Sequence, residues 1–272
     1  MSIKTVFIIL FFVLTLWGNE RIISLSPSIT EIVYALGGGD EMVATSDYSL
    51  YPKEAQHLPI IGGYSRPNLE KIIALRPTLV IGQDSNLATL EKLQKFGIKT
   101  LMIRLQTIDD IKDSIMTVSK NISKQENAAK LVKEIDDSLK DAKKANKPHS
   151  VMIVYGLKED LRGGIYIAGH NIFFEDIIKA CGNTNAYTSE VLSQPVLSYE
   201  NVIALNPQQI IILHSMATEP NVDVKKALHN WYAIPTEASR NKKISIVDES
   251  YLHIPSQRVA QTIKRLCREM ND

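Results

Sequence analysis

The chain has 272 residues, of which 44% are hydrophobic and 22% charged. This length and composition exclude a globally disordered chain and leave room for one large domain or two smaller ones. The formal net charge is +1 and the basic residues form no concentrated patch, so nucleic-acid binding is set aside.

Residues 1–18 have the pattern of an export signal. Lys4 precedes the uncharged run Thr5–Trp17, and the small residue Gly18 follows. A spanning helix needs about 20 apolar residues, so this run predicts a cleaved signal peptide and a periplasmic mature chain. Leu16 is bulky for a position close to the cleavage site, which keeps open an uncleaved anchor and, with it, a membrane-tethered sensor domain. No cysteine lies nearby for lipid attachment.

Beyond the signal, apolar strand-like runs alternate with helical patterns. A helix is expected through Ile29, Ile32, Val33 and Leu36. Gly37-Gly38-Gly39 follows it without a Lys-Ser/Thr pair, which favours a helix C-terminal turn over a phosphate-binding loop. Strands are expected at residues 22–25, 78–81, 99–103, 151–155, 209–213 and 244–247. The alternation predicts α/β layers with parallel sheets.

Residues 123–145 contain neither Gly nor Pro and carry one apolar stripe. The stripe comprises Ala128, Leu131, Val132, Ile135, Leu139 and Ala142. The spacing predicts a single amphipathic helix of about 35 Å that ends at Lys147-Pro148. Its central position favours a helix that joins two lobes.

A nine-residue segment recurs 130 residues further along the chain. Residues 69–77 (LEKIIALRP) correspond to residues 199–207 (YENVIALNP), and an apolar run follows each copy. The repeat predicts two similarly built Rossmann-like α/β lobes with parallel-rich sheets, joined by one long rigid helix. The expected boundaries are 1–18 for the signal, 19–122 for the N-terminal lobe, 123–147 for the linking helix and 148–272 for the C-terminal lobe.

Two lobes favour binding in the cleft between them, and the chain lacks recognisable catalytic motifs. We therefore expect a binding protein and no enzyme. The alternative is a secreted enzyme that uses this cleft, for example through Ser26 and His253.

In an oxidising compartment, Cys181 and Cys267 favour one disulfide, with two buried thiols as the alternative and a metal site less favoured.

Several motifs resemble one family, the iron-chelate and vitamin B12 periplasmic binding proteins of ABC importers. They are Arg21-Ile22-Ile23-Ser24-Leu25-Ser26-Pro27, Thr30-Glu31, Tyr51-Pro52, Gly62-Gly63-Tyr64, Asn68-Leu69-Glu70, Leu75-Arg76-Pro77, residues 180–185 (ACGNTN) and Pro255-x-x-Arg258. The pattern is most similar to the vitamin B12 branch. The resemblance implies a Cys181–Cys267 disulfide, a monomer without intrinsic cofactor, and delivery of a chelate to a membrane permease. It also implies that Glu70 and Glu200, at equivalent repeat positions, dock onto the permease.

The expected ligand is a bulky chelate: a corrinoid first, haem second and a ferric siderophore third. Aromatic and cationic side chains suit such ligands. The candidate ligand residues are Tyr48, Tyr51, Tyr64, Arg66, Phe173, Tyr251 and Arg258. Tyr64 is the favoured contact, and it would ligate the iron if the ligand were haem. The mature chain has only Trp231, whereas the vitamin B12 branch is rich in tryptophan around its cleft, so all three ligand classes stay open.

Overall fold

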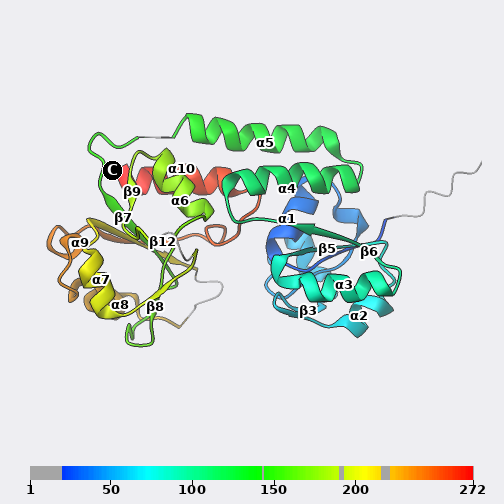
Figure 1. Cartoon of the computed structure of the whole chain (residues 1–272), viewed down its shortest axis with the longest axis horizontal. Helices are drawn as coiled ribbons and strands as arrows, with labels where there is room; N and C mark the ends of the chain where they lie inside the picture. Colours follow the sequence, from blue (N-terminus) through cyan, green and yellow to red (C-terminus); the bar gives the residue numbers. More distant parts are fainter. Residues whose placement is uncertain (1–19, 143, 190–192, 216–220, 272) are drawn as a thin grey trace, which may run out of the picture.

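The computed structural model describes residues 20–142, 144–189, 193–215 and 221–271, so the predicted signal peptide lies outside the described residues. Two α/β lobes lie side by side beneath helix α5 (Figure 1). Within these ranges, none of the helices combines the length and the apolar character that a membrane span requires.

The N-terminal lobe is built on a four-stranded parallel sheet with the strand order β2-β1-β5-β6. Its strands are β1 (Ile22–Ser24), β2 (Met42–Ala44), β5 (Leu79–Gln83) and β6 (Lys99–Ile103), and β3 (Gly62–Gly63) pairs with β4 (Arg66–Pro67) in a small hairpin. Its helices are α1 (Pro27–Ala35), α2 (Leu69–Ala74), α3 (Leu87–Lys95) and α4 (Ile108–Asn121), with short 3-10 turns at Gly39–Glu41, Lys53–His57 and Asp84–Asn86.

The C-terminal lobe is built on a second parallel sheet with the order β12-β11-β7-β9. Its strands are β7 (Ser150–Tyr155), β9 (Thr184–Asn185), β11 (Gln209–His214) and β12 (Ile244–Asp248), and β8 (Ile165–Tyr166) pairs with β10 (Val196–Leu197). Its helices are α6 (Phe173–Ala180), α7 (Tyr199–Leu205), α8 (Val224–Tyr232), α9 (Glu237–Arg240) and α10 (Val259–Asn271). All six predicted strands form, with ends within two residues of the prediction.

The two sheets have the same design, because each orders its strands as second, first, third and fourth along the chain. The repeated segments form α2 with β5 and α7 with β11, as predicted. Equivalent residues even share an unusual backbone, since Arg76 has φ 47° and Asn206 has φ 45°. A left-handed residue before a proline ends each helix and turns the chain into its strand. The predicted pair of similar lobes is therefore confirmed.

Helix α5 (Gln125–Lys140) lies across the top of both lobes and packs on α4 of one and α10 of the other (Figure 1). Its apolar stripe faces inward as predicted, but its 16 residues span only about 24 Å. The prediction of a helix that runs to Lys147 was wrong. Ser123 adopts φ 57° before the first turn, and the Ala145 amide donates to the Cys181 carbonyl at 2.8 Å, so tertiary contacts replace helical bonds beyond Lys140.

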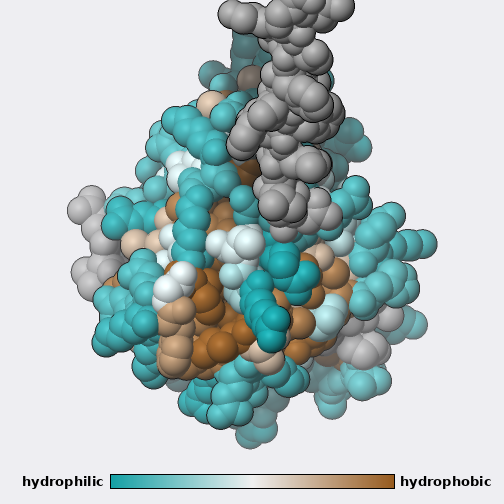
Figure 2. Space-filling view, turned by 90° about the vertical axis from the view of Figure 1, so that its right-hand side faces the viewer, coloured by the Kyte–Doolittle hydropathy of each residue, from teal (hydrophilic) through white to brown (hydrophobic). Residues whose placement is uncertain are grey.

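In the described part of the chain, three apolar clusters form the core. One fills the N-terminal lobe between its sheet and α2 and α3, and a second fills the C-terminal lobe between its sheet and α7, α8 and α9. The third is continuous from the upper face of one sheet, through α4 and α5, to α6 and α10 on the other. Figure 2, an end view of the N-terminal lobe, shows hydrophobic residues framed by hydrophilic ones. The shared cluster makes the connection between the lobes a packed core.

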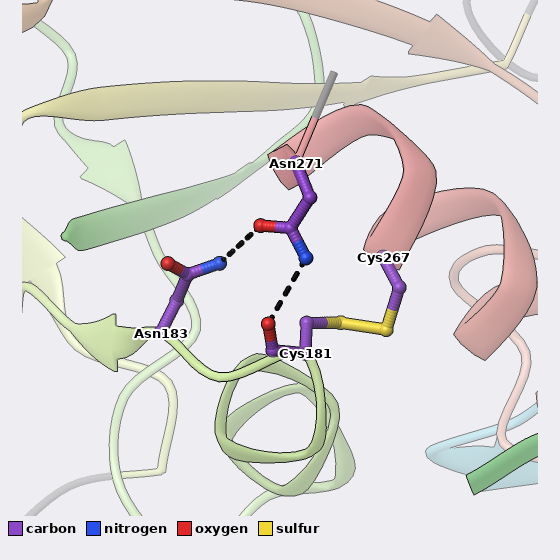
Figure 3. Close-up of a disulfide and its surroundings, with 4 residues drawn as sticks. All are labelled: Cys181, Asn183, Cys267 and Asn271. Atoms are coloured by element: carbon purple, nitrogen blue, oxygen red, sulfur yellow. Dashed lines mark hydrogen bonds between the residues drawn. A yellow bond between two sulfur atoms is a disulfide. The ribbon is translucent and has the colours of Figure 1, made fainter. Parts of the chain in front are cut away.

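The Cys181–Cys267 disulfide joins the end of α6 to α10, with a Cα–Cα distance of 5.1 Å (Figure 3). Beside it, the Asn271 side chain donates to the Cys181 carbonyl at 3.0 Å and accepts from the Asn183 amide at 2.9 Å. The predicted disulfide is confirmed.

The predicted glycine turn after α1 is confirmed too. Gly37 has φ 84°, and the Gly38 amide donates to the Val33 carbonyl at 2.9 Å, which ends the helix.

Candidate functional site

A cavity of ≈ 460 Å³ lies between the lobes. It is lined from one side by segments that follow β1, β5 and β6, and from the other by the end of β7, the start of α6 and the segment after β12. The carboxyl ends of both parallel sheets therefore meet at the cavity, which is where open α/β sheets bind ligands. Its lining residues are Ser26, Pro27, Ser28, Tyr64, Gln83, Asp84, Ser85, Ile103, Arg104, Leu105, Gln106, Tyr155, Ile172, Phe173, Ser193, Gln194, His253, Ile254 and Pro255.

Hydroxyl and carboxamide groups dominate the polar part of this lining. On the N-terminal side, Gln83 Nε2 donates to Ser26 Oγ at 2.7 Å. The same oxygen caps α1 by accepting from the Ile29 amide, so Ser26 serves the local fold. The charged groups Arg104 and Asp84 lie 3.8 Å apart and offset each other. Apart from histidine, the described residues of the lining thus carry no net formal charge.

Tyr64 lies at the tip of the β3–β4 hairpin and lines the cavity with 39% of its surface exposed. Gly62 adopts φ 108°, a conformation that glycine tolerates, and its position lets the hairpin close tightly. The Asn86 side-chain amide donates to the Tyr64 carbonyl at 2.8 Å and fixes the tip. The favoured ligand residue of the sequence is therefore presented to the cavity.

Phe173 begins α6 and lines the opposite wall, where its ring lies 4.1 Å from that of Phe174. Its amide donates to the Gln106 carbonyl at 2.6 Å, a contact that crosses between the lobes. Tyr155 ends β7 beside these rings, and its burial raises the pKa of its hydroxyl. Tyr155 therefore stays protonated and contributes an apolar ring with a neutral hydroxyl.

The other predicted ligand residues lie outside this lining. Tyr48 is 72% exposed, Tyr51 and Tyr251 stand against the Arg258 guanidinium, and Arg66 is exposed on β4. Arg258 itself is buried in an ion pair with Glu31 of α1. The structure thus brings two of the seven residues, Tyr64 and Phe173, together at the cavity.

Most of the polar lining was not predicted from the sequence, including Gln83, Gln106 and Tyr155. The available signal was position, because these residues stand at or just after the carboxyl ends of predicted strands. The Glu31–Arg258 pair was not predicted either, although both residues belong to motifs that carry the family resemblance. Within the described ranges, no group of three or more His, Cys, Asp or Glu side chains could hold a metal ion.

Glu70 and Glu200 occupy the first turns of α2 and α7, and both side chains are exposed. Their helices cover the lower side of their respective lobes, away from α5 (Figure 1). Each helix has a side-chain cap, from Asn68 and Ser198, the residues that directly precede the two copies of the repeat. The two acids are therefore presented in matching local structures.

Comparisons with known proteins agree with this architecture. A family model described as periplasmic binding protein matches residues 22–251. The vitamin B12-binding protein of Vibrio parahaemolyticus is 30% identical over 253 residues, covering 91% of this chain and 88% of the relative. The structure of the periplasmic vitamin B12 binding protein of Vibrio cholerae is 27% identical with a TM-score of 0.73, covering 92% of this chain and 96% of that one. A periplasmic haem-binding protein of Roseiflexus, in apo form, is 27% identical with a TM-score of 0.76, covering 93% and 98%.

Two α/β lobes with a cavity between the carboxyl ends of their sheets define a solute-binding protein. The chain belongs to the periplasmic binding protein family. Its role is that of the periplasmic solute-binding component of an ABC importer.

Proposed function

We propose that this chain binds a corrinoid in the cavity between its lobes and delivers it to an inner-membrane permease. The observation that carries this proposal is the lining of the cavity, which combines aromatic rings with hydroxyl and carboxamide groups and has its Arg and Asp paired. A corrin ring is broad and apolar and carries carboxamide arms, which such groups can both donate to and accept from. The 30% identity to vitamin B12-binding proteins over most of the chain supports the same choice.

The alternative ligand is haem. Tyr64 lines the cavity and offers a phenol oxygen of the kind that ligates ferric iron, and His253 lines it from the other lobe. The likeness to a haem-binding protein at 27% identity supports this alternative. A ferric siderophore is less well supported, because an anionic complex needs unpaired cations. Among the described residues of the lining, the arginine, Arg104, is instead matched with Asp84.

Titration of the purified chain with cyanocobalamin, haemin and a ferric catecholate tests the proposal. We expect calorimetry to detect saturable binding of cyanocobalamin without turnover, and little binding of the catecholate. Haemin binding with a Soret shift that is lost in Tyr64→Phe, without cyanocobalamin binding, would assign the cavity to haem. A chemical conversion of the bound ligand would instead favour the enzyme hypothesis.

We also propose that Glu70 and Glu200 dock onto the permease, because paired acids on two similar lobes suit a two-fold partner with basic residues. We further propose that the signal peptide is cleaved after residue 18 and that the mature chain is a monomer. The lobe boundaries are proposed to lie near residues 122 and 147. N-terminal sequencing and size-exclusion chromatography of the exported protein test the first two.

A further inference from the structure

A buried ion pair links the two lobes beside the cavity. Glu31 belongs to α1 of the N-terminal lobe, and Arg258 precedes α10, which packs on the C-terminal lobe. The two residues are 227 positions apart, and their side chains are 3% and 9% exposed. An ion pair at this depth is unusual, because each charge has lost its hydration.

The pair is bound in a fixed geometry. Arg258 Nε donates to Glu31 Oε2 at 2.8 Å, and a guanidinium amino group donates to Oε1, which makes the contact bidentate. Ser256 Oγ donates to Oε2 at 2.6 Å and accepts from the Arg258 amide at 3.2 Å. The carboxylate is therefore held by two residues of the C-terminal segment at once.

Aromatic rings from both lobes stack around the guanidinium. The Tyr51 ring of the N-terminal lobe is centred 4.1 Å from Arg258 Cζ, and the Tyr251 ring is centred 5.6 Å away. A flat guanidinium suits this position better than an ammonium group would. Tyr51 follows a buried hydroxyl cluster that ties its loop to β1 and α1, formed by Ser24, Thr30, Thr45 and Ser49.

The same C-terminal segment forms part of the cavity wall. His253, Ile254 and Pro255 line the cavity, and Ser256 and Arg258 follow immediately. The chain leaves β12 at Asp248, contacts α1 through this pair and returns in α10, which the disulfide fastens to α6. Ser256 and Arg258, which follow this part of the cavity wall, thus bind it to Glu31 of the opposite lobe.

We propose that Glu31 and Arg258 are positioning residues for the ligand: the pair sets the spacing of the lobes and holds the 253–255 wall at the distance that the ligand requires. A second set of inter-lobe bonds lies by α6, where the Phe173 amide donates to Gln106 and the Ile108 amide donates to Asp176 at 2.9 Å. Together with the packing around α5, these two bonded points restrain the angle between the lobes. Arg258 acts on the ligand through this wall.

The inference concerns the site of the proposed function, so its test includes a measurement that needs no ligand. Both cysteines of the sequence form the disulfide, which allows nitroxide labels on Lys92→Cys in α3 and Lys225→Cys in α8. Double electron–electron resonance then reports the inter-lobe distance. We expect Glu31→Gln and Arg258→Lys to shift or broaden the distance distribution. Arg258→Lys keeps the positive charge. It therefore tests the bidentate hydrogen bonds and the stacking on the tyrosine rings without leaving the Glu31 carboxylate unpaired.

The same variants should bind cyanocobalamin, or haemin if that is the ligand, on the order of tenfold more weakly. The reason is that the lobe arrangement able to bind the ligand would be populated only about a tenth of the time. The matched control is Glu175→Gln. Glu175 is also buried and paired, with Lys179 and His170, but all its partners belong to its own lobe. This control should change neither the distance nor the affinity.

An unchanged distance distribution in both Glu31→Gln and Arg258→Lys would overturn the inference, whatever ligand the protein binds. Weaker binding without a change in distance would also overturn it and would make Arg258 a direct ligand contact. If the wild-type chain bound none of the three chelates, the proposed function would fail, while the distance measurement would still decide the role of the pair.

Discussion

The charge state of Glu200, a proposed docking residue, depends on one hydrogen bond. The Ser198 hydroxyl donates to its carboxylate at 2.6 Å, and this bond lowers the pKa of Glu200 below its ordinary value of 4.5. For an acid whose folded-state pKa is lowered, the ionised group stabilises the folded protein. This stabilisation is present above the ordinary pKa and is lost as the pH falls through the lowered value. Glu200 is therefore charged at any pH at which docking is expected.

Replacing Ser198 tests this arrangement. In Ser198→Ala the pKa of Glu200 should rise toward 4.5, because the donated hydrogen bond is lost. The measurement is a carboxyl-carbon NMR titration of the folded protein. Ser198→Gly is the control for helix capping, since glycine retains most of the capping free energy yet also lacks the hydroxyl. An unchanged titration midpoint in both variants would exclude the hydrogen bond as the cause.

At the scale of elements, α6 and α10 are joined by packing, by the disulfide and by the Asn271 side chain. The loop closed by the disulfide separates its cysteines by 86 residues and contains most of the C-terminal lobe. Closing so long a loop removes much of the conformational freedom of the unfolded chain. The bond thus stabilises the lobe that carries half of the cavity.

Removal of the disulfide, which closes a loop of 86 residues, should lower the free energy of unfolding by about 4.6 kcal/mol in the chain-entropy model. The comparison is between the wild type and Cys181→Ala/Cys267→Ala in urea, with and without a reductant. Reductant should bring the wild type close to the variant and leave the variant unaffected. A difference below about 1 kcal/mol would mean that the unfolded chain is already compact in this region.

At the scale of the whole molecule, two similar sheets point their carboxyl ends at one cavity while their α2 and α7 helices present acids on the lower side (Figure 1). Neither Glu70 nor Glu200 lines the cavity. Ligand binding and the proposed docking can therefore be tested independently.

The variant Glu70→Ala/Glu200→Ala should bind its ligand as the wild type does but fail to support uptake, because the complementary charges that set docking are lost. Uptake by cells that carry the cognate permease is the measurement. Glu126→Ala/Glu134→Ala is the matched control, since it removes two exposed acids from α5 on the opposite side. Uptake at the wild-type rate by Glu70→Ala/Glu200→Ala would refute the docking role.

The sequence alone was sufficient to predict the alternating α/β layers of this protein. Strands such as Ser150–Tyr155 and Gln209–His214 are built around continuous apolar runs, and local sequence is sufficient to find them. The nine-residue repeat predicted the paired lobes, because equivalent segments fold into equivalent helix–strand units. The cysteine pair followed from the resemblance to a family and from the oxidising compartment.

Only the tertiary structure decided which side chains meet at the cavity. Glu31 and Arg258 lie 227 residues apart, and no local pattern states that two lobes bring them into contact. Tyr48, Tyr51 and Tyr64 look alike in the sequence, yet Tyr64 alone among them lines the cavity, because its hairpin tip is fixed by Asn86. Periodicity reports which face of an element is buried, whereas the position of that element in the assembled molecule depends on contacts between residues distant in the chain.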